Sequence, residues 1–264
     1  MLRNLSRDWS ADGAPERAEC YGPMLAALQQ RLPAAFPPAQ PVRVLVPGAG
    51  LGRLCVDTAA AGYAAEGNEC SYYMLLASSY VMNHLGDVSE DALPDAVIHP
   101  WTLQSCNIVA AADALRPVPV PDLRAGAAAA HFVPGGLSMA AGDFADVYSQ
   151  PRLKDAFDAV LTCFFIDTSH NVLQTIDVLA HTLRPGGLWI NCGPLLYHWA
   201  DAHTYLDTPE LSIEVPLEDV LSAAKAAGFE VLEQGWAPCG YADNARSLMH
   251  TRYNCATWTM VKRA

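Results

Sequence analysis

The stretch at residues 42–69, VRVLVPGAGLGRLCVDTAAAGYAAEGNE, constrains the fold of this chain more than any other part of the sequence. Its β-branched and apolar start, VRVLV, predicts a buried strand that runs directly into a glycine-rich turn. Apolar residues then recur at helical spacing from Leu51 to Ala61, and a second short strand ends at Glu69. The stretch therefore predicts one strand–helix–strand unit of an α/β fold.

This unit is typical of proteins that bind a nucleoside. Its glycines let the backbone come close to a ligand, and the N-terminus of the helix offers unpaired N–H groups. Glu69, about 20 positions after the turn, can accept hydrogen bonds from a ribose diol. Gly48, Gly50 and Gly52 follow the GxGxG spacing, whereas the dinucleotide pattern GxGxxG needs glycine where Arg53 stands. The spacing favours S-adenosylmethionine (AdoMet) over a dinucleotide, and a turn that merely packs a helix on a sheet is the structural alternative.

Composition limits the partners of the chain. A sequence of 264 residues with 52% apolar content can bury the core of one α/β domain. Its 28 acidic and 16 basic residues give a formal charge of −12, which argues against nucleic acid and anionic membranes and suits a cationic or zwitterionic small molecule. Neither a signal peptide nor a long apolar run is recognised, so we expect a cytoplasmic protein with a nuclear share left open. The oligomeric state is open too, a homodimer being one option.

The eight cysteines are scattered along the chain, with no CxxC pair and no histidine at metal-ligand spacing. Several fall inside predicted strands or helices, where cysteine behaves as a small buried hydrophobe. The spacing therefore predicts no metal site and a reducing compartment.

Two regions are expected. Residues 1–40 predict a helical lid and linker, with two short helices separated at Gly13 and with Arg7 available to a ligand carboxylate. Residues 41–264 predict an AdoMet-dependent methyltransferase domain with an irregular insertion at about 86–134. A helix that begins after Ser71 is expected to cover the sheet.

Later strands of this domain are expected to end in polar residues. LSMAAGDF predicts a strand that ends at Gly142–Phe144, where Asp143 and Phe144 suit an adenine. FDAVLTCFFID predicts a strand that stops at Asp167, and LWINCGPLLYHW one that ends near His198. The last two strands are joined without a helix and predict an antiparallel pair. The fold expected is a Rossmann-like, doubly wound and mostly parallel sheet with an antiparallel C-terminal strand, as in class I AdoMet-dependent methyltransferases, with ligands at the carboxyl ends of the strands.

Asp167 and His198 are the candidates for chemistry. Asp167 is placed at a strand mouth, although it, Thr168 or Ser169 could instead cap the helix predicted from His170. A lone histidine such as His198 is often only a hydrogen-bonded structural residue. Both residues are predicted at the carboxyl ends of adjacent strands, which favours a catalytic role for each of them.

Several long blocks of this sequence resemble the N2227-like family, whose characterised activity is carnosine N-methyltransferase. The blocks include RDWS, VLVPGAGLGRL, HPW, AGDF, TCFFIDTSHNV and LRPGGLWINCGPLLYH, and the resemblance extends over residues 2–262. It implies transfer of the AdoMet methyl group to Nδ1 of the imidazole in a histidine dipeptide, which turns carnosine into anserine.

The resemblance also implies site residues. Contacts with AdoMet are expected at Arg7, Gly48, Glu69, Asp143, Phe144 and Cys163, and the glycine turn adds Gly50. Substrate contacts are expected at Asp167, His198, Tyr241 and Tyr253. If Asp167 accepts a hydrogen bond from Nε2–H of the substrate, Nδ1 keeps the lone pair that attacks the methyl group.

Two departures from the family pattern stand out. Family members usually extend further upstream of RDWS, and they carry a run of tyrosines of which Tyr253 alone remains here. The contacts with a dipeptide substrate are therefore expected to differ from those of the family. Arg252 is expected to be available to bind a substrate carboxylate. The alternatives in order are a protein-histidine or other imidazole N-methyltransferase, an NAD-dependent oxidoreductase, and an inactive AdoMet-binding scaffold.

Overall fold

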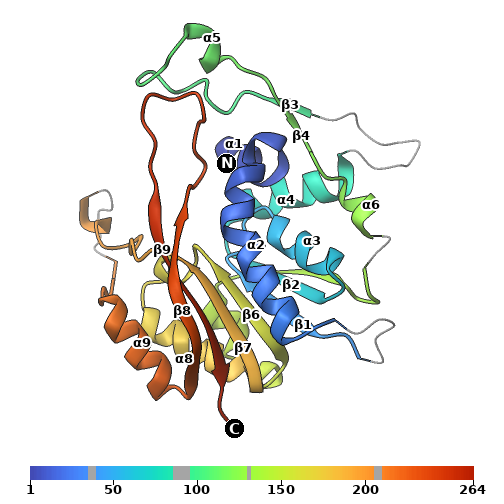
Figure 1. Cartoon of the computed structure of the whole chain (residues 1–264), viewed down its shortest axis with the longest axis vertical. Helices are drawn as coiled ribbons and strands as arrows, with labels where there is room; N and C mark the ends of the chain where they lie inside the picture. The colour runs from blue at the N-terminus through green and yellow to red at the C-terminus, as the bar shows by residue number, and fades with distance from the viewer. Residues whose placement is uncertain (35–39, 86–95, 130–131, 205–209) are drawn as a thin grey trace.

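The computed structural model describes residues 1–34, 40–85, 96–129, 132–204 and 210–264. Its centre is a seven-stranded sheet in the order β5-β2-β1-β6-β7-β9-β8 (Figure 1). The strands are β1 (Arg43–Pro47), β2 (Ala64–Glu69), β5 (Leu137–Ala141), β6 (Phe157–Cys163), β7 (Leu183–Gly193), β8 (Phe229–Cys239) and β9 (Tyr253–Lys262). β9 is antiparallel to both β7 and β8, and the remaining pairs are parallel. This confirms the predicted fold class and its antiparallel C-terminal strand.

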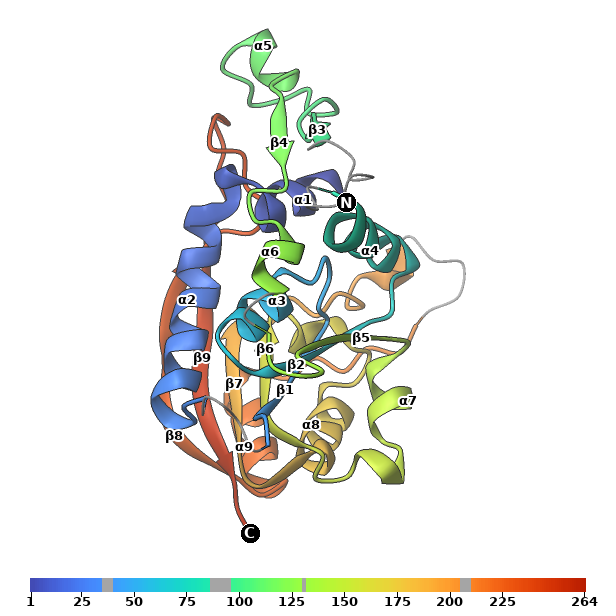
Figure 2. The same cartoon turned by 90° about the vertical axis from the view of Figure 1, so that its right-hand side faces the viewer.

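Helices cover both faces of the sheet (Figures 1 and 2). One face carries α2 (Ala14–Arg31) and α3 (Arg53–Ala60). The other carries α7 (Phe144–Tyr148), α8 (Val172–Thr182) and α9 (Leu217–Ala226). Within β1, Val44 and Val46 pack on the first layer and Leu45 on the second, as the alternation of a strand requires. Among the described residues, no helix combines the length and apolar character needed to span a bilayer.

The N-terminal region begins with α1 (Leu2–Trp9) and a short 3-10 helix (Ala11–Gly13). The predicted break at Gly13 is confirmed, but α2 is wrongly predicted as short, because it continues for 18 residues. Its length follows from its packing, since a stripe of buried side chains that includes Cys20, Met24 and Leu28 lies against the sheet.

Helix α4 (Tyr72–His84) begins where it was predicted, after Ser71, whose hydroxyl oxygen accepts a hydrogen bond from the Met74 N–H. The expectation that it covers the sheet is wrong. Of its 13 described residues, only Ser78 and Val81 are buried, because α3 already packs against β1 and β2. Its aromatic residues at 72 and 73 are each 78% exposed.

The insertion contains more regular structure than was predicted. It holds β3 (Ala96–Ile98) paired antiparallel with β4 (Val118–Val120), and the short helices α5 (Ala111–Ala114) and α6 (Ala125–Ala129). Figure 1 shows α5 above the loop that joins β8 to β9. Side chains join the two segments, with Asn244 Nδ2 donating to Gln104 Oε1 at 3.1 Å.

The strand predicted to stop at Asp167 ends earlier. β6 ends at Cys163, because Phe164 adopts a φ of 51°, which no strand tolerates. Asp167 therefore lies in a 3-10 turn, Ile166–Thr168, four residues past the strand. Likewise β7 ends at Gly193, so His198 lies in the loop that follows it.

Helix α8 starts at Val172 and not at His170. Its cap is Asn171, whose side-chain oxygen accepts hydrogen bonds from the N–H groups of Leu173 and Gln174 at 3.0 and 3.2 Å. The predicted alternative, in which Asp167 or its two neighbours cap this helix, is therefore wrong. The carboxylate of Asp167 has other partners.

Candidate active site

The glycine turn after β1 forms the floor of the site. Gly48 and Gly50 have φ values of 62° and 56°, a region that side chains with a Cβ rarely adopt. A Cβ on Gly48 would lie 2.5 Å from Cδ2 of Phe165, whereas a Cβ on Gly50 would have no atom within 4 Å. Gly48 is therefore needed for packing, and Gly50 leaves its backbone open to a ligand.

Glu69 at the end of β2 ties this turn to the start of α4. Its Oε2 accepts a hydrogen bond from the Gly50 N–H and its Oε1 one from the Ser71 N–H, both at 2.8 Å. The residue is 8% exposed. Because each carboxylate oxygen can accept more than one hydrogen bond, both can still receive hydroxyl groups of a ligand. Glu69 is thus held in place before any ligand arrives.

Asp143 and Phe144 follow β5 on the next strand. Asp143 Oδ1 accepts hydrogen bonds from the Ala145 and Asp146 N–H groups at 2.8 and 3.2 Å and so caps α7. The ring of Phe144 lies 5.3 Å from the ring of Phe165 in an edge-on contact. The capping bonds use one carboxylate oxygen, and the other receives no hydrogen bond from the described residues.

These residues border one cleft of about 670 Å³ at the carboxyl edge of the sheet. That volume is within the range of pockets for ligands of AdoMet size. Predicted residues of both kinds line it: Gly48, Gly50, Glu69, Asp143 and Phe144 from the AdoMet set, and His198 and Tyr241 from the substrate set. The two sets, which come from five different segments of the chain, therefore meet in a common space.

Asp167 is buried beside this cleft, with 2% of its surface exposed. Its Oδ2 accepts a hydrogen bond from the Leu196 N–H at 2.7 Å, and its backbone oxygen accepts one from the His198 N–H at 3.0 Å. Burial raises the pKa of Asp167, while the Leu196 amide and the nearby His198 oppose that rise. Asp167 is not among the described residues that line the cleft, although its neighbours Thr168 and Ser169 are.

The two predicted tyrosines both pack against the ring of Phe164. The ring of Tyr241 lies 4.9 Å from that of Phe164, and Tyr253 meets Phe164 edge-on at 5.7 Å. Tyr241 lines the main cleft, whereas both tyrosines line a neighbouring cavity of about 370 Å³. Arg252 forms an ion pair with Glu19 at 2.8 Å. It was expected to be available to a substrate carboxylate, but in this structure its guanidinium is already paired.

Arg7 and Cys163 lie one layer behind the cleft lining. The guanidinium of Arg7 is buried and donates to Asp8 Oδ1 and to the Tyr21 hydroxyl, both at 2.8 Å. Its carbon Cζ lies 4.6 Å from the ring centre of Tyr241, a cation–π contact. Cys163 ends β6 on the same side. Direct contact of either residue with AdoMet stays a prediction.

Sequence reasoning missed a second wall of the cleft. His170 and Trp199 stack with ring centres 4.0 Å apart, and both line the cleft. Trp199 Nε1 donates to the Thr168 backbone oxygen at 2.9 Å, which fixes its ring. The available signal was the block TSHN after Asp167, but a histidine near a helix start did not distinguish itself from a surface residue. Phe164 was missed as well, because its left-handed backbone is visible only in three dimensions.

Solved structures support the fold. TehB from Haemophilus influenzae matches with a TM-score of 0.51 at 13% identity, over 92% of this chain and 62% of that one. A chain in the complex of the Haloferax volcanii Trm112 methyltransferase activator matches with a TM-score of 0.54 at 15% identity, over 100% of this chain and 98% of that one. These matches establish an AdoMet-dependent methyltransferase fold.

Sequence relatives go further than the fold. The carnosine N-methyltransferase of Mus musculus is 39% identical over 99% of this chain, which spans 62% of that relative's length. The carnosine N-methyltransferase of Schizosaccharomyces pombe is 35% identical over 97% of this chain, and the match covers 68% of that relative's length. A family model described as carnosine N-methyltransferase matches residues 1–264. Since that match covers the whole sequence, the chain belongs to the carnosine N-methyltransferase family.

Proposed function

We propose that this protein transfers a methyl group from AdoMet to Nδ1 of the imidazole in a histidine dipeptide, with carnosine as substrate and anserine as product. One observation carries the proposal: residues expected to hold AdoMet and residues expected to hold the imidazole line the same cleft. The relatives named carnosine N-methyltransferase support the choice of substrate. The formal charge of −12 suits a small zwitterion better than an anionic polymer.

The described residues fit AdoMet, which supplies an already activated methyl group on a sulfonium when it is bound. Gly50 allows close approach of the backbone, and the two oxygens of Glu69 accept the ribose hydroxyls. The free carboxylate oxygen of Asp143 accepts the exocyclic amine of adenine, and Phe144 packs against the base. The buried charge of Arg7 lies behind Tyr241, where it contributes to the potential that a ligand carboxylate meets.

The substrate half of the cleft selects one nitrogen of the imidazole. We assign the second carboxylate oxygen of Asp167 to accept Nε2–H, since Oδ2 is used by the Leu196 amide. Nδ1 is then the nitrogen with the lone pair. Positive charge grows on the ring as the new N–C bond forms, and a carboxylate with 2% exposure stabilises it strongly because little water screens the pair. His198 and Tyr241 hold the ring in line.

We also propose that the described part of the N-terminal region, residues 1–34, acts as the lid of this cleft, while part of the predicted linker, residues 35–39, lies outside the described residues. Asn4 of α1 lines the cleft, and the indole Nε1 of Trp9 donates to the Leu51 backbone oxygen at 3.0 Å. The helix is thereby attached to the glycine turn. All eight cysteines are free thiols, which suits the reducing cytoplasm that we assign to the protein.

Replacing His198 by alanine should raise the KM for carnosine about tenfold, because one hydrogen bond to a polar ring is lost. The Kd for AdoMet should stay within about twofold, since the backbone N–H of residue 198 still donates to the Asp167 oxygen. Steady-state kinetics and calorimetry measure the two quantities. His181→Ala, at a half-buried position outside the cleft lining, is the matched control. A larger loss for AdoMet than for carnosine would contradict the assignment of His198.

The pH profile should show two protonations on its acid side. Below about pH 6.5, kcat/KM for carnosine should fall about tenfold per pH unit, because a protonated imidazole has no lone pair. The pKa of Asp167 is raised from its ordinary 3.8 by burial, so further acidification should protonate this acceptor and steepen the fall. In Asp167→Asn the second step should vanish. An equally steep profile in that variant, with the fold intact by circular dichroism, would remove Asp167 from the mechanism.

A reaction with methyl-labelled AdoMet tests the function itself. Carnosine, free histidine and a histidine-containing peptide are compared, and mass spectrometry locates the methyl group on the ring. We expect rapid labelling of carnosine at Nδ1. Preferential labelling of the peptide would favour a protein-histidine methyltransferase. Labelling at Nε2 would show that the wrong ring nitrogen was assigned as the methyl acceptor. If no methyl group reached any of the three compounds, the protein would be an AdoMet-binding scaffold.

A further inference from the structure

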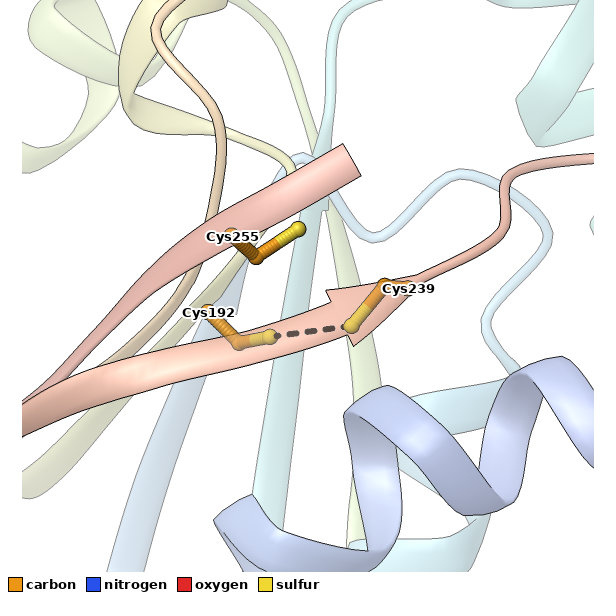
Figure 3. A group of neighbouring side chains, drawn as sticks. All are labelled: Cys192, Cys239 and Cys255. Atoms are coloured by element: carbon orange, nitrogen blue, oxygen red, sulfur yellow. Dashed lines mark hydrogen bonds between the residues drawn. The ribbon is translucent and has the colours of Figure 1, made fainter. Parts of the chain in front are cut away.

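Three cysteines far apart in the sequence meet in the core of the protein. Cys192, Cys239 and Cys255 come from β7, β8 and β9, and their Sγ atoms all lie within 4.8 Å of one another (Figure 3). Cys192 and Cys239 are 3.8 Å apart at sulfur. Each residue is at most 2% exposed. The spacing along the chain contains no metal motif, so the sequence-based expectation of no metal site did not take this cluster into account.

The sulfur geometry fits a shared metal ion better than a disulfide. A disulfide joins its sulfurs at about 2.05 Å, well below the separation found here. Tetrahedral zinc with bonds of about 2.3 Å separates its sulfurs by about 3.8 Å, which matches the Cys192–Cys239 pair at 3.8 Å. The third sulfur needs a small shift to close the triangle.

The surroundings of the cluster favour a bound cation. The three thiols are free and buried, so their sulfur atoms are available to one shared ion. Two further cysteines, Cys20 and Cys163, pack in the same hydrophobic cluster as these three.

We infer that Cys192, Cys239 and Cys255 form a binding site for a thiophilic d10 metal ion, Zn²⁺ in the first place. Thiolates are the ligands that such ions select. The other occupant of the same sulfur set is Cu⁺, which accepts three thiolates.

The position of the cluster gives the ion a task in the reaction, an inference that rests on the proposed function. Cys239 lies two residues before Tyr241, Cys255 two residues after Tyr253, and Cys192 begins the segment that leads to His198. An ion bound to the three cysteines links the bases of all three segments. It therefore holds the substrate wall of the cleft while leaving Glu69 and Asp143 untouched.

Metal content of the purified full chain is the first test. After expression with added Zn²⁺, elemental analysis should find one ion per chain, and the Cys192→Ser/Cys239→Ser variant should lose it. Cys55→Ser is the matched control, because Cys55 is also fully buried but lies in α3 and outside the cluster. Co²⁺ in place of Zn²⁺ should give sulfur-to-metal charge-transfer bands and intense tetrahedral d–d bands.

The remaining outcomes are decisive in either direction. X-ray absorption that finds three or four sulfur ligands around Zn²⁺ or Cu⁺ supports the site, and fewer sulfurs refute it. The site is refuted if the wild-type protein takes up neither ion, or if it holds no more metal than the double serine variant. The three thiols would then be only small buried hydrophobes. Because these measurements need no substrate, they stand even if the proposed methyl transfer fails. If both hold, removal of the ion by a chelator should raise the KM for carnosine while the Kd for AdoMet stays unchanged.

Discussion

Asparagine in place of Asp167 should lower kcat about 10²- to 10³-fold, the usual effect of removing one preorganised electrostatic partner of a developing charge. The amide cannot compensate positive charge on the imidazole, and its NH₂ group can donate to the wrong ring nitrogen. Affinity for AdoMet should not change, since the contacts proposed for AdoMet do not include Asp167. Single-turnover kinetics and calorimetry with AdoMet measure the two effects.

This substitution also separates catalysis from scaffolding. Asparagine keeps an oxygen that can accept the Leu196 N–H, whereas Asp167→Ala loses that bond as well. Burial raises the pKa of Asp167, so ionisation costs free energy in the folded state at every pH above that raised value. The neutral variant should therefore unfold at the same or a higher temperature at pH 7. A marked fall in Tm together with unchanged turnover would make Asp167 a purely structural residue.

Glu69→Ala should weaken binding of AdoMet about 10- to 100-fold, because hydrogen bonds to a charged group contribute about 1.5–3 kcal/mol. Two effects combine: the ribose hydroxyls lose their acceptor, and the Gly50 and Ser71 N–H groups lose the carboxylate that orients them. Titration calorimetry with AdoMet and with S-adenosylhomocysteine gives the Kd values. Both ligands should lose affinity equally, since they share the ribose.

The same strand provides a matched control for Glu69. Glu66 lies on β2 too, and its Oε1 accepts a hydrogen bond from the Tyr148 hydroxyl at 2.7 Å, outside the cleft lining. Glu66→Gln should leave the Kd for AdoMet unchanged. Glu69→Gln keeps one of the two acceptor oxygens, so its Kd for AdoMet should lie between the values of the wild type and Glu69→Ala. If Glu69→Ala bound AdoMet at full strength, the ribose contact would be assigned to the wrong residue.

Local sequence was sufficient where neighbouring residues decide the structure. The strand that leads into Gly48, the end of β2 at Glu69 and the cap at Ser71 each depend on a few adjacent side chains and backbone angles, and all three were predicted correctly. The antiparallel tail was also predictable, because two strands without an intervening helix can pair in few ways.

Boundaries were wrong where a distant contact competes with local preference. The apolar run up to Asp167 has the composition of a strand, yet Phe164 turns out of β6 with a φ of 51°, and its ring packs on Tyr241. Asn171 caps α8, because the Asp167 carboxylate accepts a hydrogen bond from the N–H of Leu196, 29 residues away in the sequence. Neither partner can be identified from spacing.

What the sequence alone determined is the α/β fold, the glycine turn and the identities of the polar residues at the strand ends, because these follow from local periodicity and backbone freedom. Tertiary structure alone decided which side chains share a space. It brought His198 and Tyr241 to the cleft of Gly50 and Glu69, and it gathered the three cysteines of β7, β8 and β9. The reason is physical: strand order and register bring together residues that are dozens of positions apart, and no local pattern encodes that pairing.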